Sequence, residues 1–275
     1  MFSVHVDGRK LTICAVSLTL ITLVSTWIIT MIQMRQEDHP AFNAKQFLPT
    51  LSQTANFEPG RTIFAMGLTI SAVLFSFASY LRFALVEAVL LSNVLHRAHV
   101  RRLHAANVVA VLGGLVYCTM FALVASFNSR DFGKEHVAFA ITFFVVSIVH
   151  DFLVALIDWH IMYPARMIWQ QEGTSVPVLS RRFAKLGMNG LLSVTAIVFL
   201  IIWLLRLDYN LFAIFEYLIM LQITMFWMST AQDFEFFDVT LRSRLAVTQN
   251  AADDHQSDQN VPLVELETSS SGALR

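Results

Sequence analysis

Six runs of apolar residues, separated by polar stretches, constrain the fold of this chain more than any other feature. A helix needs about 20 residues to cross the ~30 Å hydrocarbon core of a bilayer. Each run has about that length, and the expected spans are residues 11–32, 62–83, 105–127, 137–159, 186–205 and 211–231. Inside lipid, only helices and closed barrels satisfy their own backbone hydrogen bonds. The sequence therefore predicts an all-α, six-span transmembrane bundle in residues 1–240.

Composition excludes most other classes of protein. Hydrophobic residues make up 56% of the chain and charged residues 14%, against about 25% charged residues in soluble proteins. The net charge of −1 gives no reason to expect a nucleic-acid partner. Cys14 and Cys118 both lie inside apolar runs, so we expect neither a disulfide framework nor a Cys-based zinc site. We also expect no metal and no bound cofactor. The G-x-S-x-G, P-loop, dinucleotide-binding and H-E-x-x-H motifs of soluble enzymes are missing from the sequence.

Lysine and arginine are distributed unevenly along the chain. Six spans place both termini on one side of the membrane, together with the loops after the second and fourth spans. Of the 19 basic residues, only six lie on the opposite side: Arg35, Lys45, Arg61, Arg130, Lys134 and Arg206. Because basic residues accumulate in cytosolic loops, both termini are predicted to be cytosolic. Residues 241–275, which become rich in Asp, Gln and Ser, are predicted to form a disordered cytosolic tail.

Two segments need separate interpretation. The apolar character of the second span continues past Arg82 to Leu95, so the span either ends near Arg82 or continues as a longer, tilted helix. Residues 47–61 form a polar loop that nevertheless contains apolar side chains between prolines, which restrict the backbone. We expect this loop to be an ordered cap on the lumenal side.

Apart from Arg82 at the end of the second span, ionisable side chains enter two of the predicted spans. Glu216 lies roughly 9 Å below the start of the sixth span, and the fourth span contains His150, Asp151 and, at its end, Asp158. Such groups face protein or water because lipid offers them no partner. They either form a proton-handling group near the middle of the membrane or make structural hydrogen bonds to neighbouring helices. Both interpretations remain open from the sequence.

Three stretches carry a resemblance to a known group. They are FLPTLSQTANFEPGR at residues 47–61, SFNSRDFGKEHVAF at residues 126–139, and the sixth span from Phe212 to Phe234. These stretches are similar to the Frag/DRAM/Sfk superfamily, over about residues 10–240. The sixth span looks most like the post-GPI-attachment-to-proteins factor two branch. The ending DFEFFDVTLRS also resembles the damage-regulated autophagy modulators.

The resemblance implies a function in lipid remodelling of GPI anchors after their attachment to protein. In that pathway an unsaturated chain is removed from the sn-2 position and a saturated one is installed. The protein would act at the reacylation step, as enzyme or accessory factor, with membrane lipids and GPI-anchored proteins as partners. The implied location is the Golgi or ER membrane, with the lysosomal or plasma membrane as alternatives. The sister branches imply a different function, a non-enzymatic regulator of autophagy or of lipid-kinase recruitment.

An acyltransferase of this kind needs a base that deprotonates the hydroxyl of the lyso-lipid, and acyl-CoA is a candidate co-substrate. We expect His150 to be the base, because neutral imidazole accepts protons near pH 7, with Asp151 or Glu216 orienting it. The resemblance adds candidate residues on the lumenal loops, which are Pro49, Ser52, Pro59, Arg61, Asp131, Glu135 and His136. The family has a His-Glu pair where this chain has Glu135 followed by His136.

Overall fold

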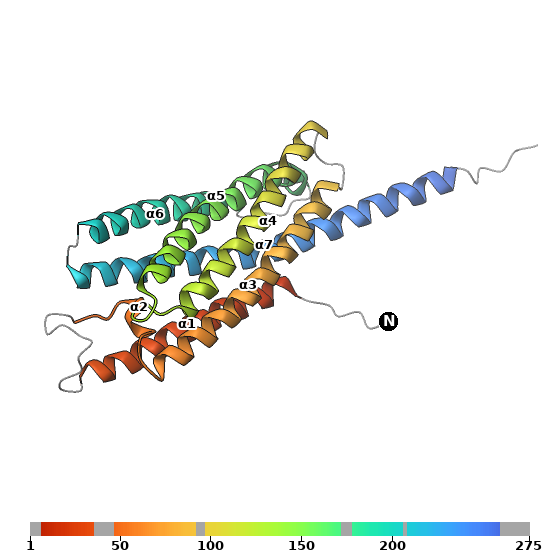
Figure 1. Ribbon diagram of the computed structural model, residues 1–275. Coiled ribbons are helices and arrows are strands. Elements are labelled where there is room, and N and C mark those ends of the chain that lie inside the picture. The colour runs from red at the N-terminus through yellow and green to blue at the C-terminus, as the bar shows by residue number, and fades with distance from the viewer. Residues whose placement is uncertain (1–6, 36–46, 92–96, 172–177, 206–207, 259–275) are drawn as a thin grey trace, which may run out of the picture.

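The computed structural model describes residues 7–35, 47–91, 97–171, 178–205 and 208–258. For residues 91, 97–99, 162–171, 178–184 and 235–258 the description covers the backbone alone. The described segments contain seven helices and no strand: α1 (Gly8–Met34), α2 (Leu51–Thr54), α3 (Gly60–Leu91), α4 (Arg97–Ser126), α5 (Gly133–Gln171), α6 (Val178–Leu204) and α7 (Tyr209–Asp258). All except α2 are long and apolar enough to cross a membrane (Figure 1). The predicted all-α, six-span architecture is confirmed.

The six long helices form a closed ring. Each packs against the next one in the chain, and α7 returns to pack against α1. In addition to its neighbours α6 and α1, α7 contacts α3 and α5 across the ring. The start of α1 and the far part of α7 lie at one end of the bundle, whereas α2 and the connections α4–α5 and α6–α7 lie at the other (Figure 1). We call the latter the α2 end; that it faces the lumen remains a prediction.

Threonines allow α1 to pack closely against α3. The buried face of α1 carries Thr12, Thr19, Thr22, Thr26 and Thr30. Four of their hydroxyls donate to the carbonyl four residues earlier, at 2.8–2.9 Å, so they need no partner from another helix. Gly67 of α3 lies against this face, and a Cβ there would overlap the Thr22 side chain. A small residue is therefore required where the two backbones approach.

Aromatic residues fill the middle of the bundle. Trp227 of α7 is fully buried, and its Nε1–H donates to the Tyr117 hydroxyl at 3.1 Å. Its ring also packs on Phe75 of α3, with 4.6 Å between the ring centroids. The outer surface carries exposed apolar side chains such as Ile21, Phe77, Val145 and Leu204. This distribution is typical of a bundle that meets lipid on its outside.

The helices extend beyond the predicted spans. α3 runs without interruption past Arg82 to Leu91, and the remainder of the longer alternative, up to residue 95, lies outside the described residues. α5 extends to Gln171 and α6 begins at Val178, past the predicted limits at residues 159 and 186. Hydropathy predicts where a helix leaves the hydrocarbon core and does not predict where the helix ends. A helix that has already formed gains one backbone hydrogen bond with each further residue. A helix can therefore continue into the polar region.

The same physical reason applies to the end of α7. The tail was predicted to begin at residue 241, but the backbone remains helical to Asp258. The stretch after residue 240 contains neither glycine nor proline before Asp258, so nothing in it ends the helix. The rest of the predicted tail, residues 259–275, lies outside the described residues.

Candidate functional site

Residues 47–61 cover the α2 end and are tied to the start of α7. The amide of Phe47 donates to the Asn210 side-chain oxygen at 3.0 Å, and the Tyr217 hydroxyl donates to the carbonyl of Pro49 at 3.1 Å. A capping box, in which two residues of the loop satisfy each other's backbone amides, begins α2. The loop therefore covers the α2 end as the predicted cap would, and both its order and its position on the lumenal side stay predictions.

Ser52, His136 and Glu216 meet beneath this cap. They come from α2, from the first turn of α5 and from the second turn of α7. The Ser52 Oγ atom lies 2.9 Å from His136 Nε2 and 2.8 Å from Glu216 Oε1. The amide of Leu51 donates to the second Glu216 oxygen at 2.7 Å. His136 and Glu216 are both buried, whereas Ser52 is partly accessible.

The carbonyl of Phe127 determines which nitrogen of His136 carries hydrogen. This carbonyl lies 2.6 Å from Nδ1 and can only accept, so Nδ1 must donate. Two arrangements of the remaining protons satisfy the distances. In one, neutral His136 accepts from the Ser52 hydroxyl and a protonated Glu216 donates to Ser52 Oγ. In the other, charged His136 donates to Ser52 and the Ser52 hydroxyl donates to ionised Glu216. Both contain the same number of protons, so a proton can pass between His136 and Glu216 through Ser52.

A cavity of about 320 Å³ opens beside these three residues. Asn56 adds a further polar group to its lining. The rest is mainly apolar and aromatic, and includes Ile141, Phe144, Phe199, Leu200, Trp203 and Phe212. Ile141, Leu200 and Trp203 are also exposed on the outside of the bundle. The apolar part of the cavity therefore reaches the surface that meets lipid, and its volume falls within the range of small-molecule sites.

The other candidates from the lumenal loops lie around the cavity and do not line it. Arg61 Nη1 and Asp131 Oδ2 form an ion pair at 3.2 Å, with both side chains about half exposed. This pair joins the start of α3 to the α4–α5 connection. Glu135 is exposed on the first turn of α5. Pro49 accepts the hydrogen bond described above, and the carbonyl of Pro59 accepts one from an amide in the first turn of α3.

His150 and Asp151 lie farther along α5, away from the cavity. His150 Nδ1 and Asp151 Oδ1 are 2.9 Å apart, and both side chains are buried. The imidazole stacks on Tyr117 and Trp227, with 5.8 Å between ring centroids in each pair. No hydrogen bond joins His150 to Glu216 in the part of the chain that the structure describes. The structure therefore separates these two residues, which the sequence analysis had placed in one group.

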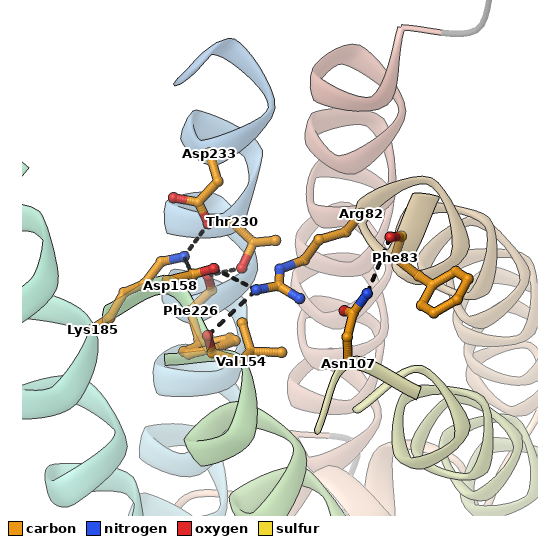
Figure 2. Close-up of polar contacts among 9 residues, drawn as sticks. All are labelled: Arg82, Phe83, Asn107, Val154, Asp158, Lys185, Phe226, Thr230 and Asp233. Atoms are coloured by element: carbon orange, nitrogen blue, oxygen red, sulfur yellow. Dashed lines mark hydrogen bonds and ion pairs between the residues drawn. The ribbon is translucent and has the colours of Figure 1, made fainter. Parts of the chain in front are cut away.

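Four charged side chains form a second buried cluster, which we call the charge network. Asp158 of α5 pairs with Arg82 of α3 and, at 2.7 Å, with the Nζ atom of Lys185 of α6 (Figure 2). Lys185 also pairs with Asp233 of α7. All four residues are less than 5% exposed. Two positive and two negative charges thus compensate one another and connect four helices.

Comparison with known families gives a clear result. A family model described as the Frag1/DRAM/Sfk1/Cwh43P N-terminal domain matches residues 8–237. The chain belongs to this family. The match includes all six membrane-spanning helices and every residue of both clusters, so the Frag/DRAM/Sfk resemblance found in the sequence is confirmed. No curated protein and no solved structure matches the chain.

Sequence reasoning missed the charge network of this Frag1/DRAM/Sfk1 family member. Arg82 and Asp158 were considered separately, and Lys185 was not considered as a partner for either. The sequence did contain a signal for the network, which is the depth of each charged residue within its span. Arg82, Asp158 and Asp233 each lie roughly 33–38 Å along a helix that starts at the α2 end, at ~1.5 Å per residue. Charges at one depth on neighbouring spans are expected to pair, because none of them can face lipid.

Proposed function

We propose that this member of the Frag1/DRAM/Sfk1 family remodels the lipid part of GPI anchors after their attachment to protein. The observation that carries the proposal is the cavity at the α2 end, which is polar beside Ser52 and apolar along α5 and α6. A lipid has the same two parts, an ester region and an acyl chain. The likeness of the sixth span to the post-GPI-attachment-to-proteins factor two branch supports GPI anchors as the substrate class.

The depth of the cavity fits the ester region of a bilayer lipid. His136 and Glu216 lie roughly 5 and 10 Å along their helices from the α2 end. The interfacial layer between the hydrocarbon core and water is about 5–8 Å thick on each side. An ester near this layer would therefore meet Ser52, while its chain would lie against Phe144, Phe199 and Trp203. The open side of the cavity lets a lipid enter from the membrane.

Two modes of action fit this site. As an enzyme, the protein would transfer the saturated chain to the lyso-lipid, with acyl-CoA or another acyl ester as donor. As an accessory factor, it would hold the lyso-lipid and present it to a separate enzyme. In both cases the proposed location is the Golgi or ER membrane, and GPI-anchored proteins are the partners.

Mass spectrometry of GPI-anchor acyl chains in cells that lack the protein tests the proposal. We expect anchors to lose saturated sn-2 chains, and re-expression of the wild-type chain to restore them. Normal GPI chains in these cells, together with altered autophagic flux, would contradict the proposal and favour the regulator suggested by the sister branches. Total phospholipid chains in the same cells serve as the control, because remodelling confined to GPI anchors leaves them unchanged.

A further inference from the structure

We infer that Ser52 is a nucleophile that carries the acyl chain as a serine ester, with His136 as its base, and that the acyl donor is a glycerolipid of the surrounding membrane. This inference rests on the proposed function, because it names the chemistry and the donor of the same site. It differs from the expectation based on the sequence in both the base and the acyl donor.

The contact between Ser52 and His136 has the geometry of an activated nucleophile. Nucleophile and base are expected within about 2.6–3.2 Å of each other, with a third group orienting the base. Ser52 Oγ and His136 Nε2 are 2.9 Å apart, and the carbonyl of Phe127 holds Nδ1 at 2.6 Å. Because Nδ1 keeps its hydrogen, Nε2 of the neutral ring is the atom free to accept the Ser52 proton. The oxygen of Ser52 remains partly accessible and lines the cavity.

Glu216 positions the serine. Its two oxygens are engaged by the Ser52 hydroxyl and by the amide of Leu51, the residue before Ser52. It therefore holds both the backbone and the side chain of the nucleophile. No hydrogen bond or ion pair joins it to His136 in the described part of the chain, so it acts on the base through Ser52.

Asn56 supplies a hydrogen-bond donor for the negative oxygen that forms when Ser52 attacks an ester. The Asn56 Oδ1 atom accepts from the Ser129 hydroxyl at 3.1 Å and from the amide of Arg130 at 3.2 Å. A backbone amide can only donate, so these bonds identify the oxygen and the nitrogen of the Asn56 side chain. The Nδ2 group has no partner among the described residues, and Asn56 lines the cavity. A donor of this kind stabilises charge that develops in the transition state.

The chemistry of the lining favours a membrane lipid without net charge over acyl-CoA. A CoA thioester carries several phosphate charges, which proteins bind with arginine, lysine or clustered amides. None of the described residues that line the cavity is lysine or arginine, and Glu216 would repel an anion when ionised. The apolar walls instead continue to Leu200 and Trp203, which are exposed on the outside of the bundle. A glycerolipid already in the membrane can reach Ser52 along this side.

Both steps of the transfer are balanced without a further reactant. Ser52 Oγ attacks the ester carbonyl of the donor and gives its proton to His136. The bond between the carbonyl carbon and the glycerol oxygen breaks, and His136 returns the proton to that oxygen, which leaves a lysolipid and an acyl-Ser52 ester. The hydroxyl of the lyso-GPI then gives its proton to His136 and attacks the serine ester. Ser52 leaves and recovers the proton.

The test uses the purified full-length protein in nanodiscs. One sample contains phosphatidylcholine with a deuterated palmitoyl chain at the sn-2 position, and a second contains deuterated palmitoyl-CoA with unlabelled lipid. A third is treated with a fluorophosphonate, a general reagent for activated serines. Mass spectrometry of the peptide that contains Ser52 measures the modification. We expect labelling by the phospholipid and by the fluorophosphonate, with at least 10-fold less label from palmitoyl-CoA.

Variants separate chemistry from folding. Ser52→Ala should abolish labelling of this peptide, and His136→Gln should slow it by about 100-fold or more, the contribution of a general base. Ser126→Ala is the matched control, because Ser126 is an exposed serine at the same end whose hydroxyl, among the described residues, bonds only to its own helix. Its labelling should equal that of the wild type. Thermal unfolding of each variant shows whether it is folded. If His136→Gln does not fold, the result for Ser52→Ala alone decides whether Ser52 is the nucleophile.

Each contrary result overturns one named part of the inference or of the proposed function. If neither the phospholipid nor the fluorophosphonate labels Ser52, it is not a nucleophile. If palmitoyl-CoA labels Ser52 as well as the phospholipid does, the assignment of the donor is wrong. In cells that lack the protein, full restoration of saturated GPI chains by Ser52→Ala would also reject the inference but keep the proposed function. Normal GPI chains in those cells would reject the proposed function instead, whatever happens to Ser52.

Discussion

The two buried polar clusters of this bundle differ in how their charges and hydrogen-bonding groups find partners. The charge network contains four full charges that compensate one another, and the cavity next to it measures only about 10 Å³. That space is about enough for one water molecule. The cluster around Ser52 contains two titratable side chains that share protons through a hydroxyl, beside a cavity of about 320 Å³. One cluster is closed and compensated, and the other is open.

This difference indicates two different roles. A buried charge without its partner is strongly unfavourable, so the charge network holds α3, α5, α6 and α7 in one arrangement. It leaves no room for a substrate. The cluster around Ser52 keeps an accessible oxygen and an adjacent space, which a purely structural group of hydrogen bonds does not require. Changes in the charge network should therefore alter stability, and changes around Ser52 should alter chemistry.

The largest expected effect on stability comes from Lys185→Met. It leaves Asp233 buried without its partner and should cost about 3–5 kcal/mol, as breaking buried ion pairs does. Thermal unfolding of the detergent-purified protein, followed by tryptophan fluorescence, measures this loss. The double variant Lys185→Met/Asp233→Leu leaves Arg82 paired with Asp158 and should recover most of it. Equal stability of the single and double variants would contradict the view that charge compensation matters.

His150→Leu should have an intermediate effect. It leaves buried Asp151 without its hydrogen bond, which costs about 1–3 kcal/mol. Because His150 does not line the cavity of about 320 Å³ beside Ser52, the GPI chains made per folded molecule should stay normal. Measurement of both stability and GPI chain composition separates a structural role of His150 from a chemical one. Loss of saturated chains with unchanged stability would instead return His150 to the role of base that the sequence suggested.

Glu216→Gln should change stability by no more than about 1 kcal/mol, because the amide can accept from Leu51 and donate to Ser52. It should slow acyl exchange by about 10-fold or more, because glutamine has no negative charge to stabilise the imidazolium that forms when His136 takes the Ser52 proton. The rate of deuterated chain transfer in nanodiscs gives the measurement, with the unfolding midpoint as control. Full activity would show that Glu216 is only a structural hydrogen-bond acceptor.

The smallest effect is expected for Arg61→Gln. This change breaks the exposed ion pair with Asp131, and exposed pairs contribute about 0–1 kcal/mol. Neither residue lines the cavity, so acyl exchange should match that of the wild type. Unfolding and exchange measured on the same preparation test both parts. A large loss of exchange would place the Arg61–Asp131 pair in the substrate site.

Several features of the candidate site were available from the sequence, but their grouping was not. Ser52 and His136 were found through the loop resemblance, and Glu216 through its charge within a span. They were assigned to different groups because 84 residues separate Ser52 from His136 and 80 more separate His136 from Glu216. Nothing local relates positions so far apart. The docking of α2 against α5 and α7 brings them within hydrogen-bond distance.

The sequence by itself determined the six-span helical architecture, because the length and hydropathy of each run are local properties and lipid allows little else. It also identified which side chains must face the interior. Only the tertiary structure decided that α3 passes Arg82 as one helix, that Lys185 lies between two aspartates, and that Glu216 contacts Ser52 and not His150. These outcomes depend on the rotation and depth of each helix relative to its neighbours. Packing sets both, and no single run of residues records them.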